Sequence, residues 1–229
     1  CTVCHAIEDK GLQPKRGPNL DGVGDRMHAD WLRAFLESPH SRKPGTTMPD
    51  VLVGFDEQEK SRAISALAAF LSTQHLPFPQ LKAGGGNPLP HEFWKKGRVD
   101  EGQRLYHRIG CIACHEPDAD YAGGAPKASV LDQLLEQLDP EEIEELGLTA
   151  AARPVRSVPY GDLAAKYTSK SLTFFLINPE TNRPAGRMPN FDLEPVEAAD
   201  IAAYLRSLES APALAASATL SALVRWCRG

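Results

Sequence analysis

The sequence predicts an all-α protein that contains two tandem copies of one small domain. Three observations lead to this prediction. A Cys-x-x-Cys-His pentapeptide occurs twice, the same set of spaced residues precedes a Met–Pro pair twice, and the segments around these motifs carry apolar residues at the helical period. The length of 229 residues is sufficient for two such domains, each with its own core.

The composition limits the classes of partner. The formal net charge is −5, which argues against nucleic acid as a partner. Acidic residues concentrate in residues 116–158, which hold ten Asp or Glu against three Lys or Arg. No apolar run reaches the roughly 18 residues that a membrane-spanning helix needs. We therefore expect no transmembrane segment in this chain.

Both pentapeptides carry the residues of a cofactor attachment site. The recurring residues are Cys1, Cys4, His5, Cys111, Cys114 and His115. Cys-x-x-Cys-His is the attachment pattern of haem c. Two thiols at this spacing can add across the two vinyl groups of a haem, and the adjacent imidazole is then held beneath the iron. The motifs predict two haem c cofactors, with His5 and His115 as iron ligands.

Two other interpretations of the paired cysteines compete with haem attachment. A Cys-x-x-Cys pair also occurs in redox dithiols and in zinc sites. Zinc ribbons, however, separate their pairs by about 15–20 residues, whereas more than 100 residues separate the two pairs of this chain. A dithiol does not require a following histidine, and here histidine follows both pairs, so the pattern favours haem.

A low-spin haem iron needs a sixth ligand, and methionine is the first candidate. Met48 and Met188 are both followed by proline and flanked by turn-forming residues, which places them on loops from which they can reach a haem face. Met27 lacks the following proline and precedes a helical segment at 29–36, so we interpret it as a packing residue. Isolated histidines are alternative ligands, of which His40, shortly before Met48, is the first.

The residues before each Met–Pro pair form an internal repeat. Leucine, phenylalanine and two prolines precede each methionine by 16, 13, 9 and 4 residues. These residues are Leu32, Phe35, Pro39 and Pro44 in the first copy and Leu172, Phe175, Pro179 and Pro184 in the second. A shared spacing without gaps indicates two copies of one structural unit.

Helices are predicted on both sides of these loops. One runs from about 56 to 72, with Asp56 as N-cap and Glu59 at the third helical position, and its counterpart runs from about 194 to 208. A further helix at about 99–109 leads into the second pentapeptide. It has no counterpart before Cys1, so we expect the chain to be a fragment of a longer protein.

These elements give the predicted domain limits. The first domain covers 1–73 and lacks its entry helix, and a linker rich in proline and glycine covers 74–98. The second domain covers 99–210 and contains the acidic insertion at 116–158, in which we predict helices at 130–138 and 140–146. Residues 211–229 are a helical tail or linker, in which Cys227 is an unpaired thiol.

With both motifs and the Met–Pro loops in place, the chain resembles the class I cytochrome c family as a tandem di-haem protein. The segment Gly17-Pro18-Asn19-Leu20 adds to this resemblance. In the family, the proline of this segment offers its backbone carbonyl to the proximal histidine, which would fix the ring of His5. Pro159 resembles the counterpart of Pro18 for His115, although valine stands before it instead of glycine.

The resemblance also implies packing and function. Gly102 and Tyr106 of the entry helix should pack against Tyr204 of the last helix. His/Met ligation favours electron transfer without enzymatic turnover, with redox proteins as partners, and haem c attachment implies the periplasm or the cell exterior. Two alternatives stay open: a di-haem peroxidase, and an electron-relay module of a larger oxidoreductase, since the second repeat resembles haem modules of multidomain bacterial proteins.

Overall fold

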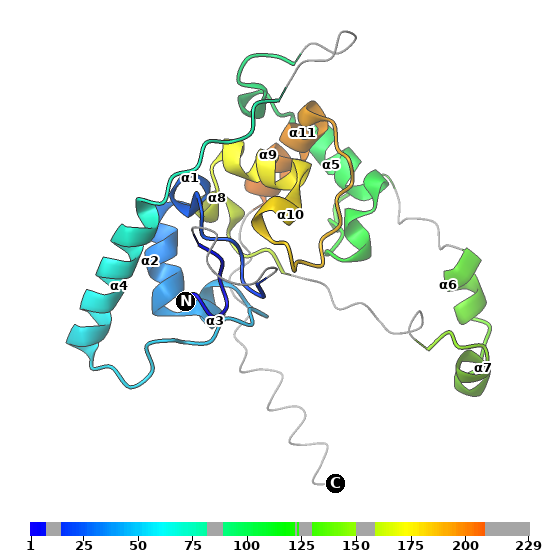
Figure 1. The fold of residues 1–229 in the computed structure, drawn as a ribbon. Coiled ribbons are helices and arrows are strands. Elements are labelled where there is room, and N and C mark those ends of the chain that lie inside the picture. The colour runs from blue at the N-terminus through cyan, green and yellow to red at the C-terminus, as the bar shows by residue number, and fades with distance from the viewer. Residues whose placement is uncertain (8–14, 82–88, 122, 124–129, 150–158, 209–229) are drawn as a thin grey trace.

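The computed structural model describes residues 1–7, 15–81, 89–121, 123, 130–149 and 159–208 (Figure 1). In this part of the chain the secondary structure is helical and contains no strand apart from a single isolated β-bridge. The predicted all-α fold is therefore confirmed. Within the same residues, no helix has both the length and the apolar character that crossing a membrane requires.

Three short helices of the first repeat correspond in length and position to three helices of the second. The first repeat contains α1 (Val23–Arg26), α2 (Ala29–Glu37), α3 (Pro39–Arg42) and α4 (Glu57–Ser72). The second repeat contains α5 (Val99–Ile109), α8 (Leu163–Lys166), α9 (Ser169–Ile177), α10 (Pro179–Asn182) and α11 (Pro195–Ser207). From α1–α3 to α8–α10, every first and last residue number rises by 140, for example from Val23 to Leu163.

Helix α4 forms as its sequence predicts. The side chain of Asp56 accepts a hydrogen bond of 2.7 Å from the backbone N–H of Glu59, which satisfies one of the free donors at the helix start. Its apolar stripe faces α2, where Ile64 and Ala68 are buried together with Leu36. This face gives the first repeat a small hydrophobic cluster.

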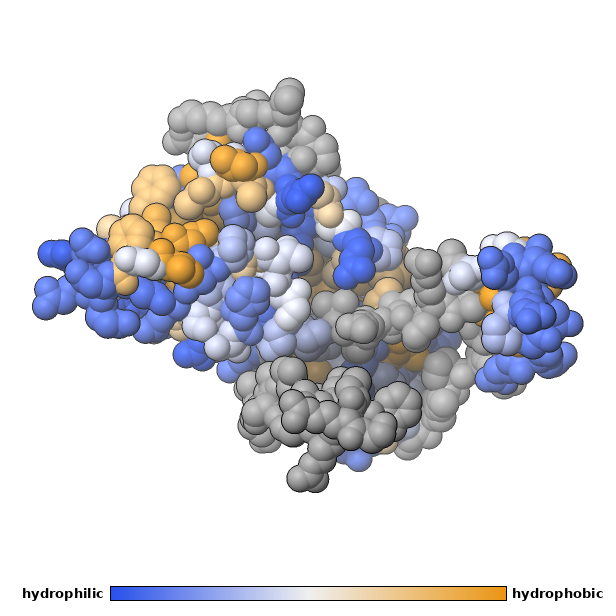
Figure 2. Space-filling model, turned by 90° about the horizontal axis from the view of Figure 1, so that it is seen from below, coloured by the Kyte–Doolittle hydropathy of each residue, from blue (hydrophilic) through white to orange (hydrophobic). Residues whose placement is uncertain are grey.

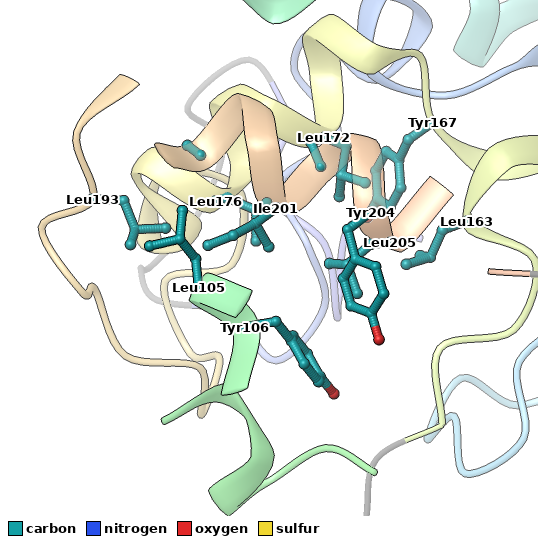
Figure 3. Packing of buried hydrophobic residues seen from close by; sticks show 12 residues of the cluster. Leu105, Tyr106, Leu163, Tyr167, Leu172, Leu176, Leu193, Ile201, Tyr204 and Leu205 are labelled. Atoms are coloured by element: carbon teal, nitrogen blue, oxygen red, sulfur yellow. The ribbon is translucent and has the colours of Figure 1, made fainter. Parts of the chain in front are cut away.

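Helices α5 and α11 cross closely and form the larger core of the second repeat (Figure 3). A β-carbon on Gly102 would lie 2.0 Å from the carbonyl oxygen of Asp200, so only glycine permits this approach. The rings of Tyr106 and Tyr204 lie beside the crossing with their centroids 5.4 Å apart. The predicted packing of the entry helix against the last helix is confirmed.

An ion pair between the exposed Arg98 and the buried Asp200 ties the start of α5 to α11. The side chain of Asp200 is almost completely buried. It accepts hydrogen bonds from the backbone N–H of Arg98 at 2.7 Å and from the guanidinium of the same residue at 2.9 Å. Because both carboxylate oxygens are engaged, the buried charge is compensated.

The segment between the repeats contains a short 3₁₀ helix, η1 (Phe93–Lys95). Phe93 is buried, and its ring centroid lies 6.1 Å from that of Phe174 in α9. Phe78 contacts the same ring at 5.0 Å. Aromatic packing therefore ties parts of the predicted linker to the second repeat, while the domain limits themselves stay a prediction.

The acidic insertion contains two short helices, α6 (Val130–Leu135) and α7 (Pro140–Glu145), which lie apart from the other helices in Figure 1. At the start of α7 the Asp139 side chain accepts from the N–H of Glu142, and the Glu142 side chain accepts from the N–H of Asp139, both at 2.9 Å. This capping box explains why so acidic a segment is helical.

The two repeats meet along α1, α2, α8 and α9. Met27 and Tyr167 form the isolated antiparallel bridge, and the backbone N–H of His28 donates to the carbonyl of Lys166 at 3.1 Å. Reciprocal contacts join α1 to α9 and α2 to α8. Met27 is half-buried and packs against clusters of both repeats, as predicted for a packing residue.

Candidate functional site

The two Cys-x-x-Cys-His motifs fold into the same tight turn. In the first, the N–H groups of Cys4 and His5 both point to the carbonyl of Cys1, at 3.0 and 2.9 Å. In the second, the N–H groups of Cys114 and His115 bond to the carbonyl of Cys111 at 3.2 and 3.0 Å, within η2 (Cys111–Ala113). Within the described part of the chain, these four cysteines form no disulfide.

The state of Cys111 bears on the alternative interpretations of these motifs. Its side chain is half-buried, and this burial raises the pKa of the thiol to about 11. A redox dithiol needs the opposite, because the thiolate is its reactive form. Among the described residues, no three or more His, Cys, Asp and Glu side chains cluster as a metal ion would require.

His5 is held by a backbone carbonyl. Its Nδ1 lies 2.7 Å from the carbonyl oxygen of Pro18. The N–H of Gly17 donates to the carbonyl of Cys4 at 2.7 Å, which ties this segment back to the motif. A neutral imidazole that donates from Nδ1 leaves its Nε2 free as a ligand, so this arrangement presets the tautomer that iron binding needs.

His115 is held differently, by an aromatic ring. Tyr160 stacks on it with a centroid distance of 4.4 Å and an interplanar angle of 20°. The hydroxyl of Tyr160 donates to that of Tyr106 at 3.0 Å, and Tyr106 donates to the carbonyl of Glu116 at 2.7 Å. Helix α5 therefore fixes both the stacking ring and the backbone directly after His115.

Burial keeps these tyrosines protonated. It raises the pKa of Tyr106 to about 12, and burial together with the hydrogen bond to Tyr106 raises the pKa of Tyr160 further. Both hydroxyls are thus neutral donors at physiological pH.

Pro159 directly precedes the stacking tyrosine, and the constant offset of 140 makes Asn19, not Pro18, its counterpart. The assignment of Pro159 to His115 stays a prediction.

Asp118 links the motif to both crossing helices. Its Oδ2 accepts from the side-chain amide of Gln103 at 2.7 Å and from the hydroxyl of Tyr204 at 3.0 Å. The hydrogen bond from Gln103, followed by one from the N–H of Asp120, holds the pKa of Asp118 below its ordinary value. The segment after His115 is therefore anchored to α5 and α11.

Both predicted methionine ligands lie on loops, as expected. Met188 is half-buried and packs against the hydrophobic cluster of the second repeat, against which Cys111 and Tyr160 also pack. Met48 packs against the cluster of Leu36, Leu52, Ile64 and Ala68. Among the described residues, that cluster contains no cysteine or histidine of the first motif.

The surroundings fit a large, mostly apolar group. The loop that follows Met48 leaves Val51, Val53 and Phe55 exposed. Figure 2 shows apolar residues at the surface of the face that it views, next to strongly hydrophilic ones. The paired cysteines, the oriented imidazoles and the apolar side chains together match a haem c, which the residues at 1–5 and 111–115 would bind covalently.

Two features of the site are not apparent from the local sequence. The stacking of Tyr160 on His115 joins residues far apart in the chain. Lys166 is buried between Trp31 and Tyr167, which belong to different repeats. The sequence does contain a signal for Lys166. Arg26 lies 140 residues before it, so the two repeats carry a basic residue at the same position.

Comparison with known proteins adds a family. The sequence model of the cytochrome c family matches residues 99–209, which span α5 to α11 and include the second motif and Met188. Searches of curated proteins and of solved structures found no significant match. A cytochrome c domain implies a covalently bound haem c. Residues 99–209 thus correspond to a cytochrome c domain, and the match supports the identification of a c-type cytochrome.

Proposed function

We propose that this protein transfers electrons through two covalently bound haem c groups, one in each repeat. The first is bound by Cys1 and Cys4, with His5 and Met48 as axial ligands. The second is bound by Cys111 and Cys114, with His115 and Met188 as axial ligands. The family match supports electron transfer by a haem protein, and the second haem and the His/Met ligation are the proposal.

One observation carries the proposal: the two motifs share a backbone turn, and the two methionines share a position relative to equivalent helices. Met48 follows the last residue of α3 by six positions, and Met188 follows the last residue of α10 by six. The first repeat therefore has the ligand set of the second, although the family match does not reach it.

The protein would influence electron transfer through the residues that bind the iron and through those that restrain these ligands. A bound haem would supply the redox chemistry. His5 and Met48 would hold one iron and His115 and Met188 the other, so neither iron would need to exchange a ligand when its charge changes. Thioether ligation raises the potential relative to two imidazoles. The carbonyl of Pro18 and the ring of Tyr160 restrain His5 and His115, which would keep both imidazoles in place during electron transfer.

Absence of enzymatic turnover is part of the proposal. A di-haem peroxidase needs an iron position that peroxide can occupy, and a methionine in the sixth position blocks it. Redox proteins that exchange electrons with the haem edges are the partners that we propose. Because haem c is attached outside the bacterial cytoplasm, we also propose the periplasm or the cell exterior as location.

The test is to produce the chain in a cell that attaches haem c and to count its haems. Intact-mass measurement should show two haem additions, and oxidised spectra should show two low-spin irons with Met-to-iron charge transfer. A single haem addition contradicts the di-haem assignment. A high-spin fraction together with peroxide turnover would favour the peroxidase.

A further inference from the structure

Helix α5 presents three polar side chains to the segment that leaves the second motif. Gln103, Tyr106 and His107 are three and four residues apart along the helix, which places them on one of its faces. The carboxylate of Asp118 accepts from Gln103, and the carbonyl of Glu116 accepts from Tyr106. His107, the third residue of this face, contacts the same segment in two further ways.

The imidazole of His107 is bonded through both of its nitrogen atoms. Nδ1 lies 2.8 Å from the backbone carbonyl oxygen of Gln103, one turn earlier in the helix. Nε2 accepts a hydrogen bond of 3.1 Å from the backbone N–H of Asp118. Because a carbonyl can only accept and an amide N–H can only donate, both bonds form only when a neutral imidazole carries its proton on Nδ1. Backbone groups therefore fix the tautomer of His107.

A tyrosine covers one face of the same imidazole. The ring of Tyr121 stacks on His107 with a centroid distance of 3.8 Å and an interplanar angle of 11°. A turn makes this contact possible, since the N–H of Tyr121 donates to the carbonyl of Asp118 at 3.2 Å. The half-buried His107 thus holds residues 118–121 by one hydrogen bond and one stacked ring.

A long insertion follows the second motif, so its histidine is restrained differently from that of the first. In the first repeat, 12 residues lie between His5 and Pro18, whose carbonyl bonds to the imidazole. In the second repeat, 44 residues lie between His115 and Tyr160, which stacks on it. Because the entropic cost of closing a loop rises with its length, a long loop restrains its ends less. Contacts with α5 therefore gain importance for the segment after His115.

We propose that His107 is a positioning residue for the second haem. It binds the N–H of Asp118, three residues after the iron ligand His115, and stacks on Tyr121, six residues after it. The chain next to the ligand is thus held on α5 independently of the rest of the insertion. The restraint keeps His115 in place and water away from this side of the haem. This inference rests on the proposed function, because His107 acts through His115 on a bound haem.

A purely structural role would end at the helix itself. His107 lies in the last turn of α5, and its bond to the carbonyl of Gln103 joins two residues of the same helix. If that bond were the whole role, its loss would lower the stability of the domain without a change at the haem. The bond to Asp118 distinguishes the two roles, because it leaves the helix and reaches the segment after the ligand.

The first variant is His107→Phe, which keeps an aromatic ring for Tyr121 and removes both hydrogen bonds. The released segment admits water to the second haem, and water favours the ferric charge, so the midpoint potential of the second haem should fall. The first haem should keep its potential. Amide hydrogen exchange at Asp118 should become about fivefold faster, the factor that corresponds to a bond of about 1 kcal/mol. Exchange at Tyr204 in α11 should stay unchanged.

The second variant, His107→Gln, tests rescue. The side-chain oxygen of glutamine lies as many bonds from the β-carbon as Nε2 of histidine, so it can accept from the N–H of Asp118. It should restore most of the potential and of the protection from exchange, although the stacked ring is lost. His91→Phe makes the same substitution at an exposed histidine and is the control, which should leave both potentials unchanged.

Two outcomes would overturn the proposal. One is a His107→Phe protein with the potential and the exchange rate of the wild type. The other is an equal fall of the potential in His107→Phe and His107→Gln, since the bond to Asp118 would then have no part in it. If His107→Phe does not fold, Tyr121→Leu replaces it: loss of the stacked ring should lower the same potential by a smaller amount and speed exchange at Asp118, and wild-type values of both would overturn the proposal.

Haem attachment and hydrogen exchange separate this inference from the proposed function. If intact mass shows that the second motif binds no haem, the proposed function fails, while exchange at Asp118 still reports on the contact with His107. If both haems are attached and His107→Phe changes neither the exchange nor the potential, the inference alone fails.

Discussion

Gly17 lies directly against His5: a β-carbon on this glycine would be 2.6 Å from both Nδ1 and Cε1 of the imidazole and 2.9 Å from the carbonyl oxygen of Cys4. His5 and Cys4 both belong to the Cys-x-x-Cys-His motif. A side chain at position 17 would therefore displace the imidazole of His5. Glycine at this position is therefore a condition for the hydrogen bond between His5 and Pro18.

Gly17→Ala should displace His5 and change the spectrum of the first haem only. The expected result is a high-spin fraction for one of two haems, measured on the oxidised protein. Gly45→Ala is the control, because Gly45 has a φ of 75° and a β-carbon added to it would have no neighbouring atom within 4 Å. It should cost about 1 kcal/mol of stability from backbone strain and leave both spectra intact. Equal spectral changes in both variants would contradict the role of Gly17.

Met48→Ala and Met188→Ala should each leave both haems attached but alter one site. Loss of the thioether removes Met-to-iron charge transfer from that site and lowers its potential, which a redox titration measures. Met27→Ala is the matched control: it should lower stability by roughly 2 kcal/mol without changing either haem. An unaltered spectrum in a ligand variant would show that another residue is the sixth ligand there.

Tyr160→Leu should change the environment of His115, whereas Tyr160→Phe should preserve it. Phenylalanine keeps the stacked ring and loses only the hydrogen bond to Tyr106, worth about 1 kcal/mol. Leucine removes the stacking, so the potential and the paramagnetic resonance spectrum of the second haem should shift while those of the first stay constant. If both variants shift the second haem equally, the hydroxyl and not the ring is the positioning group.

Gly102→Ala should destabilise the crossing of α5 and α11. The added methyl meets the carbonyl of Asp200, so the helices must separate, at a cost of about 3 kcal/mol. Chemical denaturation followed by circular dichroism measures the loss. Asp100→Ala, on the exposed side of the same helix, should stay within about 0.5 kcal/mol of the wild type. A Gly102→Ala protein of unchanged stability would contradict the close approach.

Asp118 should make stability depend on pH in the acidic range. Because the folded state lowers its pKa, its contribution is present above the ordinary value of 3.8 and is lost as pH falls through the lower folded value. Asp118→Asn should therefore be less stable at pH 7 by roughly 1 kcal/mol and approach the wild type in strong acid. Asp120→Asn removes the same charge nearby and serves as the control. Equal losses of stability in the two variants would indicate that the negative charge, and not the hydrogen bonds of Asp118, is responsible.

Much of this architecture follows from local sequence. The N-cap at Asp56, the helix at 99–109 and the loops that carry Met48 and Met188 depend on neighbours within one or two turns, and the structure has them as predicted. The contact of Gly102 with α11 follows from the family resemblance. The extent of the first insertion helix differs from the prediction, since α6 ends at Leu135 instead of 138.

Contacts between distant segments are beyond local sequence. The ring of Tyr160 stacks on His115 although a long insertion separates the two residues in the sequence. No periodic pattern of residues predicts such a contact. The position of Lys166 between Trp31 and Tyr167 depends on how the two repeats face each other, and a pattern within one repeat contains no such information. Counting onward at the offset of 140 would nevertheless have paired Lys166 with Arg26.

The bridge between Met27 and Tyr167 pairs a residue with its own counterpart, and the contacts of α1 with α9 and of α2 with α8 are reciprocal. This is the geometry of an isologous homodimer interface, here contained in one polypeptide. Because the two repeats are covalently connected, each is present at a fixed effective concentration relative to the other, whereas the subunits of a dimer associate in a concentration-dependent equilibrium. Docking of the two halves is therefore independent of protein concentration, and electron exchange between their haems would be a first-order process.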